Sequence, residues 1–321
     1  MKLLITGGAG FIGSNLTEYM LDKGYTVVGL DNYATGFAHN LKPFLAHPNF
    51  SFIEGDIRDF DCCLRATKGV DHVLHQAALG SVPRSLLDPI TSNEVNVNGF
   101  LNMLEASKQN KVKRFVYAAS SSTYGDSKGL PKVEDKIGKP LSPYAITKYV
   151  NELYAEIYAN TFGLETIGLR YFNVFGRRQD PDGAYAAVIP KFIAQFIKGE
   201  SPQINGDGSF SRDFTYIDNV IQMNHLAMLT TNPKAVNQVY NTAVGERITI
   251  LEMTELIRES LSKFDSSISN ISIKFGPDRK GDIPHSQASI EKAKRLLNYN
   301  PTHNFQQGLK ESLTWYHNNL K

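Results

Sequence analysis

Residues 1–13, MKLLITGGAGFIG, join a short apolar run to a helical pattern through glycines at positions 7, 10 and 13. Glycines at this spacing allow a tight turn after a strand, close approach of the backbone to a pyrophosphate, and a helix N-terminus whose amide groups face the anion. The alternative is that they only pack the helix against the strand. The stretch predicts the first βα unit of a dinucleotide-binding fold, with Gly7, Gly10 and Gly13 near the phosphates.

Asp31 closes the next apolar run, about 20 residues beyond the glycines, where such folds place an acidic residue. Its carboxylate can accept hydrogen bonds from both hydroxyls of the adenosine ribose and would repel a 2′-phosphate, which favours NAD over NADP. The alternative for Asp31-Asn32-Tyr33 is a turn that ends a strand. Asp56 follows the third apolar run, and it can accept from the adenine amino group or cap a helix that begins near Asp59.

Short apolar runs alternate with helical patterns in the first half of the chain, which is typical of βαβ units on a parallel sheet. The predicted fold class is α/β, a Rossmann-type doubly wound parallel sheet with a smaller, mixed α/β C-terminal region that binds substrate. Strands are predicted at 3–6, 26–30, 51–54, 72–75, 114–119, 166–171 and 238–242. Helices are predicted at 11–22, 59–67, 89–109, 143–161, 189–198, 218–230, 251–261 and 306–318. We expect 1–172 to form the NAD-binding domain, 211–246 to return to it, and 173–210 and 247–321 to form the nucleotide-sugar-binding region.

The composition excludes several classes of protein. Apolar residues make up 41% of the chain and charged residues 21%, so neither a disordered nor a membrane-embedded chain is expected. The 34 Lys and Arg residues nearly balance 32 Asp and Glu without a basic stripe, which argues against a nucleic-acid partner. Cys62 and Cys63 are adjacent, a spacing that suits neither a disulfide framework nor a zinc site, so no metal is expected. Because no apolar run reaches the ~18 residues of a membrane span, we expect a cytoplasmic protein.

Tyr144 and Lys148 lie four residues apart at the start of a predicted helix, which places the phenol and the ammonium on one face. A phenol with a pKa of about 10 is a poor base, but the Lys148 cation and an oxidised nicotinamide would both favour the phenolate, which could then take a proton from a substrate alcohol. Ser120, at the end of the fifth apolar run, can share that proton. The alternatives are a surface pair on an amphipathic helix and a serine-rich loop that satisfies its own backbone. His75 ends the fourth run and is expected to be a packed strand histidine without a catalytic role.

Three further segments extend these motifs: RYFNV at 170–174, NGDG at 205–208 and SRDFTY at 211–216. Together with the motifs above, they resemble the extended short-chain dehydrogenase/reductase superfamily, and specifically its UDP-hexose 4-epimerases, over nearly the whole chain. The resemblance implies that Tyr144, Lys148 and Ser120 are catalytic. It implies an NAD site formed by Gly7, Gly10, Phe11, Ile12, Gly13, Asp31, Asn32, Tyr33, Thr35, Gly36, Asp56, Ile57, Gln76, Ala77, Ala78, Tyr144, Lys148 and Phe172. It implies a UDP-sugar site formed by Gly80, Ser81, Ser120, Ser121, Ser122, Tyr144, Asn173, Gln179, Ala187, Val188, Asn205, Arg212, Arg279, Asp282 and Ser286, in which Asn173, Arg212 and Arg279 bind the UDP.

Two segments resemble the subgroup of epimerases that prefers N-acetylated sugars, AALGSVPRS at 77–85 and GRRQDP at 176–181. Many other members of the family carry a large aromatic residue at the position that matches Ser286. The small side chain here would leave room for a 2-acetamido group when the sugar turns over. Gly80, Ser81, Gln179 and Ala187 are further candidates for shaping that pocket.

The activity that the resemblance implies is NAD-dependent 4-epimerisation of UDP-N-acetylglucosamine and UDP-N-acetylgalactosamine through a transient 4-ketose. Tyr144 would act as the base and Ser120 would relay the proton, while UDP stays bound, the ketose turns, and NAD is reoxidised in place. The rivals of the same fold are a nucleotide-sugar 4,6-dehydratase and a UDP-glucuronate decarboxylase or epimerase. Dehydrating relatives carry Asp and Glu after the residue that matches Ser120, whereas this chain has Ser121 and Ser122, which counts against elimination. The remaining alternative, a non-catalytic NAD-binding regulator, would not need Tyr144 and Lys148.

The helices predicted at 89–109 and 143–161 resemble the pair that forms an intersubunit four-helix bundle in this superfamily, so a homodimer is expected. Their apolar faces could instead cover the sheet. The subgroup for N-acetylated sugars suggests a role in the synthesis of cell-surface polysaccharide.

Overall fold

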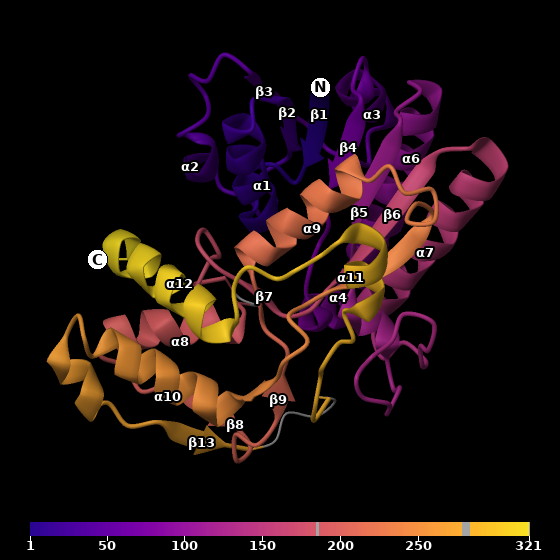
Figure 1. Ribbon diagram of the computed structural model, residues 1–321. Helices are drawn as coiled ribbons and strands as arrows, with labels where there is room; N and C mark the ends of the chain where they lie inside the picture. The colour runs from indigo at the N-terminus through magenta and orange to yellow at the C-terminus, as the bar shows by residue number, and fades with distance from the viewer. Residues whose placement is uncertain (184–185, 278–282, 321) are drawn as a thin grey trace.

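A computed structural model describes residues 1–183, 186–277 and 283–320 of the chain. At its centre lies a seven-stranded parallel sheet in the order β11-β6-β5-β4-β1-β2-β3 (Figure 1). The strands are β1 (Lys2–Thr6), β2 (Thr26–Asp31), β3 (Phe50–Glu54), β4 (His72–His75), β5 (Arg114–Ser120), β6 (Glu165–Tyr171) and β11 (Gln238–Thr242). The strand order reverses between β1 and β4, and sheets of this kind bind ligands at the carboxyl ends of the strands beside the reversal. The predicted fold class is confirmed.

Helices cover both faces of this sheet, because consecutive apolar side chains of a strand point to opposite faces. Leu3 and Ile5 of β1 belong to one cluster of buried side chains, together with residues of α1 (Phe11–Asp22) and α9 (Ile217–Leu229). Leu4 belongs to a second cluster, together with residues of α3 (Phe60–Thr67), α6 (Phe100–Gln109) and α7 (Pro143–Phe162). The sheet is therefore the middle one of three layers.

The helix predicted at 89–109 is divided into three parts. Asp88 caps α5 (Pro89–Asn93), which continues into a π-helix, η1 (Glu94–Gly99), and then into α6. A short helix that the pattern did not predict, α4 (Val82–Leu87), precedes them. Because helices are predicted from a repeat of 3.6 residues per turn, a wider π-helical turn inside the run cannot be recognised from the pattern.

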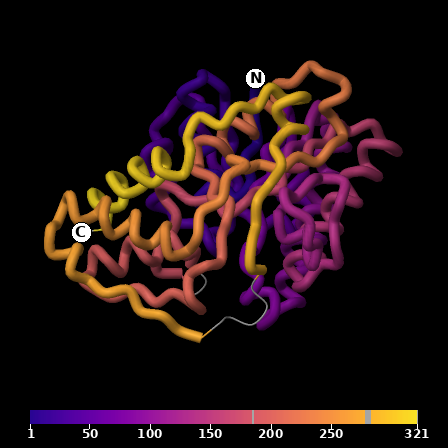
Figure 2. Tube along the Cα trace, turned by 60° about the horizontal axis from the view of Figure 1, so that its bottom comes forward, coloured from indigo at the N-terminus to yellow at the C-terminus, as the bar shows by residue number. Residues whose placement is uncertain are grey.

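The C-terminal region is built from helices and short strand pairs. Figures 1 and 2 show α8, α10 and α12 together at one side of the molecule, away from α7. The helices are α8 (Val188–Ile197), α10 (Ile250–Leu261), η3 (Ser266–Asn270), α11 (Glu291–Leu297) and α12 (Phe305–Asn319), whereas the short helices α2 (Ala38–Leu41) and η2 (Ser121–Tyr124) lie elsewhere. The pairs are β7 (Val174–Phe175) with β10 (Thr215–Tyr216), β9 (Ser211–Arg212) with β12 (Ile248–Thr249), and β8 (Gln203–Asn205) with β13 (Lys274–Gly276). The helices predicted in this half are confirmed, whereas the short strands escaped prediction because two or three residues carry no readable alternation.

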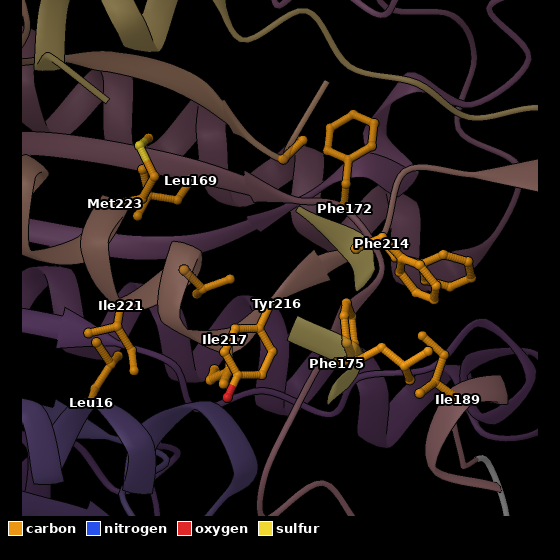
Figure 3. Packing of buried hydrophobic residues seen from close by; sticks show 14 of the residues in the cluster. Leu16, Leu169, Phe172, Phe175, Ile189, Phe214, Tyr216, Ile217, Ile221 and Met223 are labelled. Carbon is orange, nitrogen blue, oxygen red and sulfur yellow. The ribbon is translucent and has the colours of Figure 1, made fainter. Parts of the chain in front are cut away.

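One cluster of buried side chains joins the sheet to the C-terminal region (Figure 3). The ring of Phe175, just beyond β6, lies 6.4 Å from that of Phe214 and 5.5 Å from that of Phe305 at the start of α12. The two regions therefore share a core, and the division into NAD-binding and sugar-binding parts stays a prediction. No helix within the described ranges combines the length and the apolarity needed to cross a membrane.

Candidate active site

The glycine-rich turn between β1 and α1 leaves no room for side chains. Gly7 has a φ of +69°, and a Cβ on it would lie 2.9 Å from the backbone nitrogen of Ala77 on the neighbouring strand end. A Cβ on Gly13 would collide with the carbonyl oxygen of Gly7, so only glycine lets α1 approach the turn this closely. The N-cap of α1 is Gly10, and no side chain caps this helix end. The turn thus fits the pyrophosphate of a dinucleotide, with the amide groups of Phe11 and Ile12 in the first helical turn.

Asp31, at the end of β2, is tied to the glycine-rich turn. One carboxylate oxygen accepts from the backbone nitrogen of Ala9 at 2.9 Å, and the other accepts from that of Tyr33 at 2.8 Å. Burial raises the pKa of this carboxyl, while the backbone hydrogen bonds act in the opposite direction. Each oxygen still has a lone pair for a ribose hydroxyl. A Cβ on Gly36 would lie 2.8 Å from the carbonyl carbon of Ala9, so the loop after β2 also packs on the turn.

Asp56 and Asn32 lie side by side at the ends of β3 and β2, with the amide of Asn32 donating to Asp56 at 2.9 Å. The helix-cap interpretation of Asp56 is wrong, because Asp59 caps α3 by accepting from two backbone amides. The Arg58 guanidinium, 2.7 Å from Asp56, holds the pKa of that carboxyl below its usual range. Ile57 is buried, and a Cβ on Gly99 of the π-helix would come within 2.6 Å of it. The contact with adenine stays a prediction.

The end of β4 is fixed by Thr6 of β1. Its hydroxyl accepts from the backbone nitrogens of Gln76 and Ala77, both at 3.1 Å, and shares a hydrogen bond of 2.8 Å with Nδ1 of His75. His75 lies between the rings of Phe100 and Phe115, and burial lowers its pKa to about 3. A histidine that stays neutral in the core is the packed residue that the sequence predicted.

Two predicted cofactor residues have side chains that point elsewhere. The amide of Gln76 bonds Asn224 at 3.1 Å and Tyr171 at 3.0 Å on the α9 side of the sheet. Phe172 is fully buried in the core, where its ring lies 5.9 Å from that of Tyr124. A contact of either residue with NAD would therefore be made by the backbone.

The structure brings Tyr144, Lys148 and Ser120 together. Ser142 caps α7 by accepting from the nitrogen of Ala145 at 3.1 Å, and this start of the helix places Tyr144 in the first turn and Lys148 in the next. Ser120 ends β5, and its hydroxyl is near enough to the Tyr144 phenol to act to lower its pKa. The Lys148 ammonium is buried and donates to the carbonyl of Ala118 at 2.8 Å.

Burial raises the pKa of Tyr144, and the nearby Ser120 hydroxyl acts in the opposite direction. The effect of Lys148 and of an oxidised nicotinamide on this phenol stays a prediction. Burial lowers the pKa of Lys148 to about 8, although the carboxylate of Glu152 acts in the opposite direction. Lys148 is thus partly neutral near pH 8.

Several residues that support this group were not found from the sequence. Asn96, on the π-helix, accepts from the nitrogen of Leu79 at 2.8 Å and donates to its carbonyl at 3.1 Å. Asn96 also donates to Thr147 at 3.2 Å, and the Thr147 hydroxyl donates to the carbonyl of Tyr144 at 2.8 Å. The backbone nitrogen of Tyr144 donates to Ser85 of α4 at 3.0 Å. Isolated polar residues of this kind give no pattern in the sequence, because their partners lie in other segments.

The predicted UDP residues surround β9. Asn173, with a φ of +37°, donates its side-chain amide to the carbonyl of Asp213 at 2.9 Å. The Arg212 guanidinium donates to the carbonyls of Ser211 at 3.0 Å and Pro284 at 3.1 Å. The backbone nitrogen of Ser286 donates to the carbonyl of Ser211 at 3.0 Å, which holds Ser286 beside β9. Arg279 and Asp282 lie outside the described residues.

The other predicted substrate residues lie on several elements. Ser122 donates to Ser120 at 2.8 Å, and Gln179 donates to the carbonyl of Val174 at 3.1 Å. Ser81 caps α4 with a φ of +121°, and Gly80 before it has open space around its Cβ position. The remaining residues are Ser121 in η2, Ala187 and Val188 at the start of α8, and Asn205 in β8.

A cavity of about 730 Å³ lies on β9 and β12 at the starts of α10 and α12, where Arg212, Phe214 and Ile248 line it. Tyr144 and Ser120 are not among the residues that line it, so this cavity is not where the reacting atoms would lie.

One group of side chains has the spacing of a metal site, since ligand atoms of Asp218, His303 and Glu311 lie within 4.8 Å of one another. The guanidinium of Arg177 bonds Asp218 at 2.7 Å, and the Tyr216 hydroxyl donates to Glu311 at 3.0 Å. Each of the two carboxylates thus already has a protein partner, a cation for Asp218 and a hydroxyl for Glu311.

The sequence and the structure were compared with those of known proteins, and both identify relatives of this chain. Residues 3–243 match the family model described as the NAD dependent epimerase/dehydratase family. A putative UDP-glucose 4-epimerase of Methanocaldococcus jannaschii is 35% identical over 99% of both chains. Among solved structures, the UDP-N-acetylglucosamine 4-epimerase of Methanobrevibacter ruminantium M1 in complex with UDP-N-acetylmuramic acid is 37% identical, with a TM-score of 0.91 over 99% of this chain and 98% of that one. The UDP-glucuronic acid 4-epimerase of Bacillus cereus with UDP-glucuronic acid and NAD is 31% identical, with a TM-score of 0.90 over 99% of both chains.

Relatives named as epimerases of UDP-glucose, UDP-N-acetylglucosamine and UDP-glucuronic acid thus match this chain over nearly its whole length. The chain belongs to the NAD dependent epimerase/dehydratase family, within the extended short-chain dehydrogenase/reductase superfamily, and is an NAD-dependent enzyme of the UDP-sugar 4-epimerase/dehydratase type.

Proposed function

We propose that this enzyme interconverts UDP-N-acetylglucosamine and UDP-N-acetylgalactosamine through a transient 4-ketose. The observation that carries the proposal is Ser286, a small residue whose backbone is bonded to Ser211 beside the predicted UDP residue Arg212. A small side chain at this fixed place leaves room for a 2-acetamido group when the sugar turns. The relative from Methanobrevibacter ruminantium, a UDP-N-acetylglucosamine 4-epimerase, supports the same substrate class.

In this proposal, Tyr144 and Ser120 handle the proton of the sugar O4. The Tyr144 oxygen accepts this proton, directly or through the Ser120 hydroxyl, and returns it when the ketose is reduced. Ser122 donates to Ser120 at 2.8 Å, which leaves the Ser120 hydrogen free to point at Tyr144 or at the substrate. Bound NAD supplies a reversible hydride acceptor and a positive charge that favours the phenolate. Lys148 holds the end of β5 through Ala118 and adds a partial positive charge beside Tyr144.

Arg212 and Asn173 would hold the UDP while the ketose turns. The Arg212 guanidinium donates to the backbone carbonyls of Ser211 and Pro284, and a guanidinium can also form strong, charge-assisted hydrogen bonds with phosphate oxygens. The same reasoning extends to Arg279 as a second cation for the diphosphate. When the ligand is held by its UDP, the sugar ring can turn and present either face for hydride transfer. Epimerisation requires this freedom.

The two arginines of the GRRQDP segment favour an uncharged sugar over a uronic acid. Arg178 bonds Glu18 of α1 at 2.6 Å, and Arg177 bonds Asp218 of α9 at 2.7 Å. Both cations are therefore committed to holding the 176–179 loop against these helices. Neither is placed to pair with the carboxylate of UDP-glucuronate, the ligand named for the Bacillus cereus relative.

The rival reactions lack support in the side chains after β5. A dehydratase needs a carboxylic acid and a carboxylate to remove water from the sugar, whereas Ser121 and Ser122 fill the two positions after Ser120. A non-catalytic regulator would not need the buried Lys148 or its hydrogen bond to Ala118. Epimerisation uses all three of Tyr144, Lys148 and Ser120.

The test is a comparison of UDP-N-acetylglucosamine, UDP-glucose and UDP-glucuronate with one preparation of the wild type and one of Ser286→Tyr. We expect kcat/KM of the wild type to be highest for UDP-N-acetylglucosamine. The bulky tyrosine should lower this value by at least about tenfold and change that for UDP-glucose much less, whereas Ser286→Ala should leave both unchanged. A wild type that prefers UDP-glucose or UDP-glucuronate, or a stable 4-keto-6-deoxy product, would refute the proposal.

We also propose a cytoplasmic homodimer. Side chains on α4, α5 and α7 form an exposed apolar surface, in which Leu87 is 77% exposed, Ile90 73% and Ile157 55%. Exposed apolar surface of this kind is commonly covered by another chain. The two α7 helices of a dimer, with α5 and its continuation, would give the expected four-helix bundle.

A further inference from the structure

The carboxylate of Asp213 is the most deeply buried acidic group near the predicted substrate residues. Its side chain is 0% exposed. One carboxylate oxygen accepts from the backbone nitrogen of Val244 at 3.1 Å, and the other accepts from those of Gly245 at 3.0 Å and Ala288 at 3.1 Å. Asp213 thus joins three segments that are far apart in the sequence.

The segments around Asp213 and Ala288 carry predicted substrate residues, and the segment around Gly245 is bonded to the second of them. Asp213 directly follows Arg212, and its own backbone carbonyl accepts the side-chain amide of Asn173 at 2.9 Å. Ala288 lies two residues after Ser286, whose backbone is bonded to Ser211. Gly245, with a φ of +88°, turns the chain so that its carbonyl accepts from Gln287 at 2.8 Å, which fastens the same segment a second time.

We propose that Asp213 is a positioning residue for the UDP-sugar site, whose carboxylate sets the distance between the strand that carries Arg212 and the segment that carries Ser286. The inference rests on the proposed function because it concerns the binding of a UDP-sugar. Asp213 touches none of the reacting atoms. It acts by holding the groups that would bind UDP and shape the pocket around the sugar.

A carboxylate is needed here because all three partners are donors. An amide in its place has one oxygen and one NH₂ group, so one or two of the N–H groups of Val244, Gly245 and Ala288 would face another donor. A buried donor without an acceptor is costly, and the segments would move apart to relieve it. The ionised form accepts all three hydrogen bonds, although burial raises the pKa of Asp213 to about 7 and the nearby Glu246 adds to this.

The experiment compares Asp213→Asn with a matched control, Asn219→Ala, in the NAD-containing enzyme. Asn219 of α9 is also fully buried and also joins distant backbone groups, since it accepts from Thr302 at 2.8 Å and donates to His303 at 2.7 Å. The segments that it joins carry no predicted substrate residue. The measurements are kcat and KM for UDP-N-acetylglucosamine, the Kd of UDP by calorimetry, Tm, and the amount of NAD bound per chain.

We expect Asp213→Asn to raise KM and the Kd of UDP by about tenfold or more, to change kcat by less than about threefold, and to retain NAD. Asn219→Ala should lower Tm by about as much as Asp213→Asn does, but it should leave KM and the Kd of UDP unchanged. An unchanged Kd for UDP in Asp213→Asn, or an equal rise in both variants, would overturn the proposal. A wild type that binds UDP but does not epimerise UDP-N-acetylglucosamine would refute the proposed function and leave the Asp213 comparison with UDP intact.

Hydrogen exchange in the wild type tests the same proposal without a substitution. The amides of residues 244, 245 and 288 should be protected in the NAD-containing enzyme, and UDP should increase their protection together. Rapid exchange of these amides, or protection that UDP does not alter, would contradict a positioning role.

Discussion

The buried ion pair between Glu152 and Arg170 connects the stability of the fold to Lys148, the lysine proposed to be catalytic, and Glu152→Gln tests that connection. The guanidinium bonds the two carboxylate oxygens at 2.9 and 2.7 Å, and the side chains are 7% and 5% exposed. Arg170 also donates to the carbonyl of Glu134 at 3.0 Å and lies 4.8 Å from the ring of Tyr124. The pair thus ties α7, which carries Lys148, to β6.

Glu152→Gln leaves a buried guanidinium without a counter-charge, and breaking such pairs costs about 3–5 kcal/mol of unfolding free energy. For a chain of this length, this corresponds to a Tm lower by roughly 5–8 °C. The control is Glu291→Gln, which removes an exposed pair with Lys294 and should cost less than about 0.5 kcal/mol. The measurement is thermal unfolding followed by circular dichroism.

The same substitution should change the pH dependence of turnover. The Glu152 carboxylate acts to raise the pKa of Lys148 against burial, so its removal should move that pKa below about 8. The alkaline fall in kcat should then shift to lower pH in Glu152→Gln and stay in place in Glu291→Gln. A Tm within about 1 °C of the wild type, or a pH profile that does not shift, would refute this account of the pair.

Three further predictions concern the cofactor site, the assembly and the pH dependence. Gly13→Ala should abolish NAD retention, because the new Cβ would collide with the carbonyl of Gly7; full NAD content by absorbance after denaturation would contradict the packing argument. Ile157→Asp should convert a dimer to a monomer in sedimentation, whereas a wild type that is already monomeric would refute the proposed assembly. In the wild type, kcat should fall as pH rises through about 8, because the buried Lys148 loses there the positive charge that is proposed to favour the Tyr144 phenolate, and Lys148→Arg should keep its charge and move this fall to higher pH.

Much of the fold could be predicted because its elements have strong local signals. The first half of the sheet is identified by the glycines at 7, 10 and 13 and by Asp31 at the end of β2. The turn between β1 and α1 packs as tightly as the spacing of the glycines requires, and Asp31 is bonded to it. The division of 89–109 could not be predicted, since a π-helical turn follows no readable period.

The site was predictable where its residues form a motif and not where they act through distant partners. Tyr144 and Lys148 could be predicted because a spacing of four residues places them on one face of a helix. Ser120 could be predicted because it lies at the end of a strand. Asn96 and Asp213 were missed, since each is one polar residue whose importance comes from backbone groups of other segments. The rise in the pKa of Tyr144 that burial causes could not be predicted, because it depends on packing that the sequence does not reveal.

The central claim is that Tyr144 exchanges a proton with the sugar beside bound NAD, and Tyr144→Phe tests it most directly. The measurement is the rate of conversion of UDP-N-acetylglucosamine to UDP-N-acetylgalactosamine, together with the NAD bound per chain. The account predicts a rate at least about a hundredfold below that of the wild type, with NAD content unchanged. Turnover within threefold of the wild type, with NAD still bound, would contradict it.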